Sequence, residues 1–177
     1  MSLYEILCEE DVVQSINDNL EILLNYIPEL KLIIGFEHRN KGHFLNVWDH
    51  TLLALSLSEN NFDERLVLLL HDIGKSIAYQ EKEDGTRSFH GHPQASAEIA
   101  YKILKRLDFS ENYINKICYY IKNHDNVISD DLIQNNFEDA LFLYKVQYCD
   151  SLAHNPDILE KKKKYLKRIK EKLKYKK

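Results

Sequence analysis

Hydrophobic residues recur at helical spacing along almost the whole chain. Between residues 12 and 27 they fall three or four positions apart, which predicts one amphipathic helix that ends at Pro28. A second helix is expected over residues 47–58, with Asn46 as its N-cap. The first third of the chain is therefore predicted to be helical.

The next apolar segment differs because its middle is apolar on every side. A helix is expected over residues 64–73, capped by Asp63 and ended by Gly74 at the C′ position. Since residues 66–70 leave no polar face, this helix is predicted to lie buried at the centre of the fold.

The helical pattern stops between residues 76 and 92. The pair Asp84-Gly85 is a turn signal, so a small hairpin or an ordered loop is expected within residues 77–91. Any β structure should be confined to this segment.

Helical spacing resumes at Pro93, which suits the first position of a fourth helix. Ser110 is the expected cap of a fifth helix, a sixth spans residues 138–153, and a last one follows Pro156. The last helix carries an apolar stripe of Leu159, Leu166, Ile169 and Leu173. The fold class is therefore all-α, a single-domain helical bundle over residues 1–157 followed by a basic helix or tail over residues 158–177.

Length and cysteine content narrow the class of protein. A chain of 177 residues fits one domain with a sizeable core. Its three widely spaced cysteines fit no disulfide framework and no CxxC metal site, which favours a reducing compartment. No apolar run approaches a membrane span and the N-terminus is acidic, so a cytoplasmic protein without membrane contact is expected.

The net charge of −4 is unevenly distributed. Residues 160–177 hold ten Lys and one Arg against two Glu, a local charge of +9, so the remaining chain carries −13. Such a tail can bind an anionic partner such as RNA, dock on its own acidic body, or form a solvated helix end. The pattern alone leaves these alternatives open.

The pair His71-Asp72 at the end of the buried helix is the first chemical signal. Burying an unpaired polar or charged group costs several kcal/mol. A divalent cation would satisfy both side chains, because imidazole nitrogen and carboxylate oxygen are good ligands for Mn, Fe, Co, Ni and Zn. The alternative is a core histidine that pairs with its neighbour or with backbone carbonyls.

Two further residues make the metal hypothesis stronger. His50 lies on the helix expected to pack against the buried one, and Asp150 lies in the sixth helix. Three packed helices would then bring His50, His71, Asp72 and Asp150 to one point, a known way to build a metal site.

These residues resemble the H…HD…D signature of the HD-domain metal-dependent phosphohydrolases. The similarity is greatest to the HD domain appended to bacterial CCA-adding tRNA nucleotidyltransferases, and it covers roughly residues 28–156. It rests on four ordered segments: VWDHTLLAL at 47–55, LLHDIGK at 69–75, HGHP with ASAEIA at 90–100, and DSLAHNP at 150–156. Barely fifty residues precede His50, so only the phosphohydrolase part, standing alone and without CCA addition, is expected.

The resemblance implies a role for each ligand. His50, His71, Asp72 and Asp150 would hold a divalent metal ion (Mn, Fe, Co, Ni, Zn or Mg), with one or two ions per chain. Asp72 would bridge to a second ion where one is present. The metal would activate a water molecule for attack on phosphorus.

His92 and His124 are expected to bind a second metal or the substrate phosphate. His92 precedes a proline at a predicted helix N-terminus, where backbone N–H groups also favour phosphate. The alternative is that both are ordinary surface or capping histidines. His90 could exchange roles with His92, and the sequence does not decide between them.

Charged neighbours complete the candidate site. Lys75 is expected to face the phosphate and stabilise transition-state charge, alongside Asp72 as a catalytic residue, or else to stabilise a helix C-terminus. Asp49 and Asp125 each adjoin a histidine and could orient it, or lie on the surface.

Several other candidates have weaker signals. His43 and Arg39 could line the entrance but are more simply loop residues. His38 and His154 are expected to be structural, although His154 belongs to a segment near Asp150.

The sequence therefore predicts a phosphatase or phosphodiesterase that acts on a nucleotide or a 2′,3′-cyclic phosphate. One alternative is a nucleoside polyphosphate or signalling-nucleotide hydrolase of the same superfamily. Another is a non-catalytic RNA-binding module that uses the basic tail, and a third is that the histidines are incidental. The expected partner is a phosphorylated small molecule or nucleotide, with RNA as an open possibility and the oligomeric state undetermined.

Overall fold

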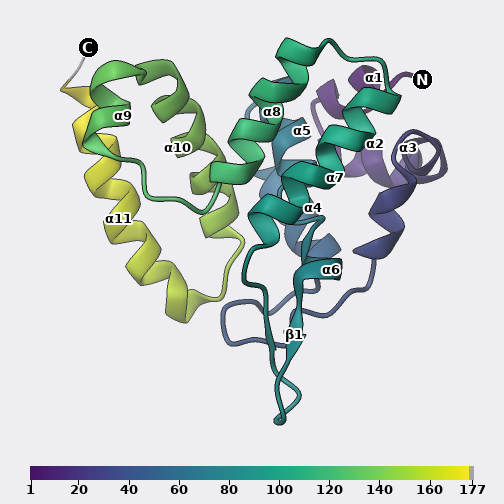
Figure 1. Ribbon diagram of the computed structural model, residues 1–177, viewed down its shortest axis with the longest axis horizontal. Helices are drawn as coiled ribbons and strands as arrows, with labels where there is room; N and C mark the ends of the chain where they lie inside the picture. The colour runs from purple at the N-terminus through teal and green to yellow at the C-terminus, as the bar shows by residue number, and fades with distance from the viewer. Residues whose placement is uncertain (176–177) are drawn as a thin grey trace.

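A computed structural model describes residues 1–175 and shows an all-α bundle with a very small hairpin, as the sequence predicts (Figure 1). Its elements in chain order are α1 (Leu3–Cys8), α2 (Val12–Asp18), α3 (Leu20–Tyr26), the 3₁₀ helix η1 (Pro28–Leu32), α4 (Val47–Ser56), α5 (Phe62–Leu70), α6 (Lys75–Ala78), β1 (Gln80–Glu81), β2 (Arg87–Ser88), α7 (His92–Arg106), α8 (Glu111–Asn123), α9 (Asp130–Asn135), α10 (Phe137–Leu152) and α11 (Pro156–Lys174).

Helix α5 is the centre of the core. It contacts α1, α4, α7, α8 and α10, and its residues 66–70 are fully buried. This confirms the prediction from its all-round apolar sequence. Since α5 is enclosed on every side, its C-terminal end delivers His71 and Asp72 into the interior.

Helices α9, α10 and α11 lie together at one side of the molecule (Figure 1). Helix α10 joins them to the rest because it also packs on α4 and α5. The basic segment after residue 157 is mostly helix α11, which docks on this group through buried Leu166, Ile169 and Leu173. The docking places the start of α11 beside the end of α10.

The single helix predicted over residues 12–27 is wrong, because the segment divides into α2 and α3 at Asn19. The Asn19 side-chain amide donates to the Ser15 carbonyl, as does its backbone N–H, so the residue ends one helix before the next begins. Four short helical elements, α1, η1, α6 and α9, were not expected, and two of them have clear signals in the sequence. Their signals were caps: a Ser2–Glu5 capping box for α1 and Ser129 for α9.

The expected ends of α5 also need correction. Its N-cap is Asn61, not Asp63, and the helix ends at Leu70. Gly74 has a φ of −72° and is not a left-handed C′ residue. Its place is instead dictated by space, since a Cβ there would lie 2.4 Å from the Ser96 backbone nitrogen.

Other boundaries shift by two residues or less, and the largest of these shifts is at α4, which ends at Ser56 and not at residue 58. Helix α7 begins at His92, one residue before Pro93, while Asn46 and Ser110 cap α4 and α8 as predicted. The hairpin lies within the expected 77–91 segment and projects at the bottom of Figure 1. All three cysteines are unpaired.

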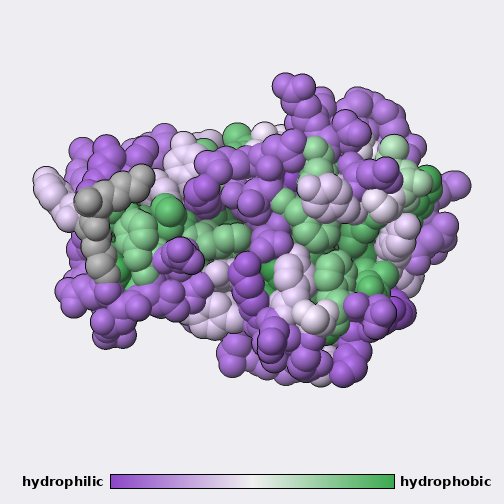
Figure 2. All heavy atoms as spheres, turned by 90° about the horizontal axis from the view of Figure 1, so that it is seen from above, coloured by the Kyte–Doolittle hydropathy of each residue, from purple (hydrophilic) through white to green (hydrophobic). Residues whose placement is uncertain are grey.

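The face opposite the hairpin is mostly hydrophilic, with hydrophobic side chains showing between the helix ends (Figure 2). Among the described residues, no helix combines the length and the apolar character needed to cross a membrane.

The close approach at Gly74 gives a stability prediction. In Gly74→Ala the new methyl group would meet backbone atoms of α7, which cannot rotate away, so we expect the free energy of unfolding to fall by about 3 kcal/mol. Gly85→Ala at the open hairpin tip should cost only about 1 kcal/mol, from its positive φ alone. Urea unfolding of both variants measures the difference, and equal losses would contradict the packing argument.

Candidate metal centre

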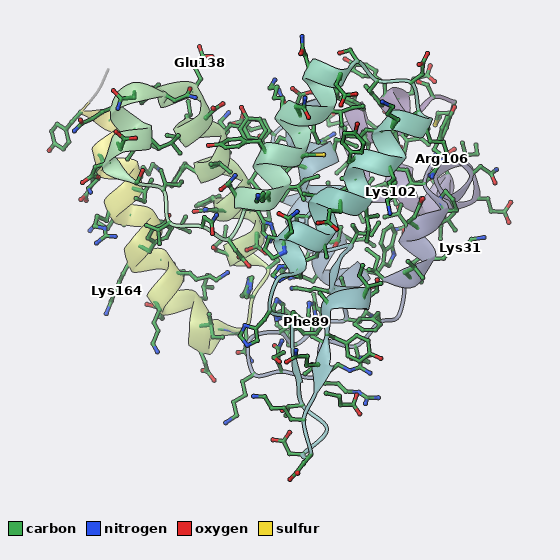
Figure 3. The ribbon with its side chains drawn as sticks, in the orientation of Figure 1. Lys31, Phe89, Lys102, Arg106, Glu138 and Lys164 are labelled. Carbon is green, nitrogen blue, oxygen red and sulfur yellow. The ribbon has the colours of Figure 1, made fainter. Side chains whose placement is uncertain are left out.

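The ends of several helices converge on one polar pocket. Helices α5, α8 and α10 end there, α7 begins there, and α4 passes alongside. The pocket has a volume of about 360 Å³ and is lined by His43, Asp72, Lys75, Phe89, His90, Gly91, His92, Pro93, His124, Asp125, Asp150 and His154. Phe89, labelled in Figure 3, marks its position near the middle of the molecule.

The four predicted ligands lie together at the floor of this pocket. His50 Nε2 lies 2.9 Å from Asp150 Oδ1 and 3.7 Å from Asp72 Oδ2. His71 Nε2 lies 3.3 Å from Asp72 Oδ2 and 3.5 Å from Asp150 Oδ1. All four side chains are almost fully buried. One ligand atom each of His50, His71 and Asp150 lies within 4.8 Å of the others, and Asp72 adjoins this trio through His50 and His71.

A shared hydrogen bond orients the histidine rings. In each, Nδ1 lies within hydrogen-bond distance of a backbone carbonyl, which makes Nδ1–H the donor and leaves Nε2 as the nitrogen that can bind a metal ion or a proton. The pairs are His50–Ala153 at 3.0 Å, His71–Leu68 at 2.6 Å, His92–Phe89 at 2.9 Å, His124–Ile121 at 2.6 Å and His154–Asp150 at 2.7 Å.

Two atoms of the centre are buried without a hydrogen-bond partner among the described residues. They are His71 Nε2 and Asp72 Oδ1. An unsatisfied buried polar atom costs about 1–3 kcal/mol, so a fold rarely retains two at one point without a ligand. Imidazole nitrogen with carboxylate oxygen is a donor set that suits divalent transition metals. The residues present therefore fit a metal ion.

His92 and His124 form a second group on the other side of Asp72. Their Nε2 atoms lie 3.3 Å apart, and His92 Nε2 lies 3.2 Å from Asp72 Oδ1 and 3.4 Å from Asp125 Oδ2. If both rings donate through Nδ1, two lone pairs face each other, and a proton or a cation must lie between them. Asp72 thus presents Oδ2 to the first group and Oδ1 to the second, the arrangement needed to bridge two ions.

Lys75 is buried beside the first group. Its ammonium donates to Asp72 Oδ2 at 2.7 Å and to His38 Nε2 at 3.1 Å. Burial and the nearby Lys75 charge lower the pKa of His38 to about 3, so this ring stays neutral and accepts the hydrogen bond from Lys75. His38 and His43 stack with their centroids 3.7 Å apart, which holds them as a wall around the lysine.

The carboxylates control the charge state of the metal-free centre. Burial alone would lower the pKa of His71, but Asp72 and Asp150 outweigh it and raise that pKa to about 10. Burial likewise disfavours the charged carboxylates, yet the cationic neighbours hold the pKa of Asp72 and Asp150 well below the usual value. The metal-free centre is thus zwitterionic, with protons in the place of a cation.

The remaining predicted residues occupy different places. Asp125 is half exposed but lies beside His92 and His124, as expected for a residue that orients them. His90 is exposed at the pocket edge while His92 points inward, which separates the two. Asp49 is exposed at the start of α4, where its carboxylate accepts from Asn46 at 2.6 Å, so it serves the helix cap and does not orient His50. Arg39 pairs with Glu81 of the hairpin.

Three residues contribute more than the sequence indicated. His43 and His154 line the pocket, and Lys162 of α11 reaches Asp150 Oδ2 at 3.3 Å. The sequence signal for His154 was its position four residues after Asp150. Lys162 is one of four consecutive lysines, which the sequence does not distinguish, although they lie on different faces of the helix.

Comparison with known protein families decides the class. Residues 41–161 match the HD domain family. The chain belongs to this family. The match includes all four residues of the first group, both histidines of the second and Lys75.

Two curated relatives align with this HD domain region. The CC-adding tRNA nucleotidyltransferase of Thermus thermophilus is 33% identical over 105 residues, which is 56% of this chain and 24% of the relative. The A-adding tRNA nucleotidyltransferase of Deinococcus radiodurans is 36% identical over 104 residues, 55% of this chain and again 24% of the relative. The aligned region thus spans about a quarter of each relative's length.

The raised pKa of His71 predicts how metal binding depends on pH. Below about pH 10 the metal-free ring is protonated, and it must lose that proton to become a ligand. Binding at pH 7.5 should therefore release about one proton from His71, and affinity should rise up to about tenfold per pH unit.

Titration calorimetry in buffers of different ionisation enthalpy counts the released protons. The His71→Gln variant should release about one fewer than the native protein. A native protein that binds metal without releasing a proton would contradict the charge state.

Proposed function

We propose that this protein is a metal-dependent phosphohydrolase that cleaves a phosphomonoester or phosphodiester of the nucleotide or 2′,3′-cyclic phosphate class. One observation carries the proposal: buried His50, His71 and Asp150 meet with Asp72 beside them, and among the described residues two polar atoms of this cluster have no hydrogen-bond partner. A purely structural role would need only matched hydrogen bonds. The membership in the HD domain family supports the same chemistry.

Each group of the pocket then has a task. His50, His71, Asp72 and Asp150 would hold a divalent ion, which would supply an activated water and withdraw charge from a phosphoryl oxygen. His92 and His124 lie within reach of Asp72 Oδ1 and would bind a second ion or donate to the phosphate. Lys75 places a fixed positive charge where negative charge develops on the phosphoryl oxygens.

Two facts support the proposed substrate class. The curated relatives are tRNA nucleotidyltransferases by name, so their HD domain regions occur in proteins that handle nucleotides and RNA ends. The pocket of about 360 Å³ lies within the range of about 300–1,000 Å³ that small-molecule sites occupy. A nucleoside polyphosphate or signalling nucleotide is the alternative substrate, and a panel of phosphoesters separates it from monophosphates and cyclic phosphates.

Binding of RNA is a second candidate because α11 keeps an exposed basic face. Lys161, Lys164 and Lys167 are exposed after the helix has docked, and Lys164 points outward in Figure 3. Substituting these three lysines by Glu keeps the docked apolar stripe and should abolish any RNA affinity. An RNA affinity that survives this change, or that does not weaken with salt, would remove this candidate.

Replacing Asp72 tests the proposed metal chemistry. Asp72→Ala removes the residue that faces both groups, so we expect metal content to fall and phosphoester hydrolysis to drop at least about a thousandfold. Elemental analysis of protein purified without a histidine tag, together with the phosphoester panel, gives both readouts. Asp49→Ala is the control, since its carboxylate lies outside the pocket lining. Retention of metal and activity in Asp72→Ala would refute the proposal.

Replacing Lys75 separates charge stabilisation from metal binding. In Lys75→Met the buried ammonium is lost while all four ligands remain, so we expect kcat to fall by about 10²–10³ with metal content unchanged. Lys75→Arg keeps the charge and should recover part of the rate. A kcat within about threefold of the native value would show that Lys75 serves only the helix end.

A further inference from the structure

Lys162 is set apart from the other lysines of α11 by its face of the helix. The buried residues Leu166, Ile169 and Leu173 follow it at intervals of four, three and four positions, so Lys162 continues the stripe that docks α11. Its side chain is 27% exposed, whereas Lys161 and Lys163 are exposed to solvent. A charge therefore stands where the helix pattern calls for an apolar residue.

The Lys162 ammonium is held against the metal centre by two partners. It donates to Asp150 Oδ2 at 3.3 Å and to His154 Nε2 at 3.1 Å. An ammonium has three N–H donors. Asp150 takes one and the His154 ring, whose Nδ1 lies 3.4 Å from the ammonium, takes another, so one remains for a ligand.

A second cavity opens on the Lys162 side of the centre. Its volume is about 180 Å³, and it shares His124, Asp125 and Asp150 with the larger pocket. Tyr165 forms part of its wall and is fixed in place, since its hydroxyl donates to Gln147 Oε1 at 3.0 Å and accepts from the Ile128 backbone at 3.0 Å. The cavity is thus a rigid annex of the metal centre.

We propose that this second cavity is an anion subsite in which Lys162 binds a phosphoryl group of the substrate other than the one that is hydrolysed. The subsite rests on the proposed phosphohydrolase function. Its cation comes from α11 and lies just beyond residues 41–161, the part of the chain that matches the family.

Charge explains why a phosphoryl group suits the cavity. Asp125 and Asp150 border it and Lys162 is the lysine in its lining, so an anion can enter once a metal ion held by Asp150 also offsets the two carboxylates. A lysine is a compact point charge with rotatable donors, which suits a tetrahedral oxyanion. The substrate class that follows is a nucleotide with two phosphoryl groups, either joined to each other or on separate positions of the ribose.

Binding of non-hydrolysable probes tests the subsite without relying on catalysis. Methylphosphonate carries one phosphonate group and methylenediphosphonate carries two, and titration calorimetry on metal-loaded protein gives both affinities. We expect the diphosphonate to bind about tenfold more tightly than the monophosphonate, and the Lys162→Gln variant to lose this advantage. Lys162→Arg should restore part of it.

The matched control is Lys163→Gln, which removes a neighbouring charge that pairs only with Glu160 among the described residues. It should keep the full advantage of the diphosphonate. An advantage that survives in Lys162→Gln reflects chelation of the metal and would overturn the proposal, as would the absence of any advantage in native protein. Equal weakening of both probes in Lys162→Gln would mean that Lys162 only balances Asp150, which also overturns it.

Steady-state kinetics show which position of the substrate carries the second phosphoryl group. They also separate the anion subsite from the proposed phosphohydrolase function. For native protein, kcat/KM is compared among a nucleoside 5′-monophosphate, its 5′-diphosphate and its 3′,5′-bisphosphate. Lys162→Gln should raise KM for whichever two-phosphate substrate is preferred by clearly more than it raises KM for the monophosphate. If no phosphoester is hydrolysed by native protein, the proposed function fails, while the phosphonate binding still decides whether the anion subsite exists.

Discussion

The hydrogen bond between a histidine Nδ1 and a backbone carbonyl is the interaction on which the centre depends. Helices α5, α8 and α10 each end near a histidine whose Nδ1 lies 2.6–2.7 Å from a carbonyl three or four residues earlier. The last carbonyls of a helix lack the usual partner four residues on. Those of Ile121 and Asp150 accept a backbone N–H three residues on, and the imidazole adds a second donor. The same bond turns Nε2 away from the helix. The hydrogen bond at the end of the helix therefore also orients the imidazole ring.

Burial of Asp72 and Asp150 imposes the second constraint. Two carboxylates in an enclosed core cost several kcal/mol unless cations lie beside them. Lys75 lies on Asp72, Lys162 lies on Asp150, and a protonated His71 lies between the two carboxylates. A metal ion held there would take over the role of the His71 proton. Under the proposed function, the charges that balance the two carboxylates are thus also those that a phosphorylated substrate would meet.

The helices and the four ligands were predictable for different reasons. Apolar spacing alone indicated the bundle and the buried α5, because periodicity reports which face is enclosed. The convergence of His50, His71, Asp72 and Asp150 came from the ordered motifs, since residues 100 apart have no local signal that they meet. Asp49 shows the limit of adjacency: it neighbours His50 in sequence, but successive residues on a helix point about 100° apart, so its carboxylate caps α4 at the surface.

Two further features depend on tertiary contacts that no local pattern encodes. Gly74 is required because a side chain there would collide with α7. In the sequence, however, a glycine near a helix end also suggests a left-handed cap, which the structure does not have. Lys162 differs from its neighbours only through the phase of α11, which Leu166 and Ile169 fix once the helix docks. A charged residue that continues an apolar stripe is the signal that was available. Where such a stripe leads toward a cluster of buried carboxylates, the charge belongs to the site and not to the solvated face.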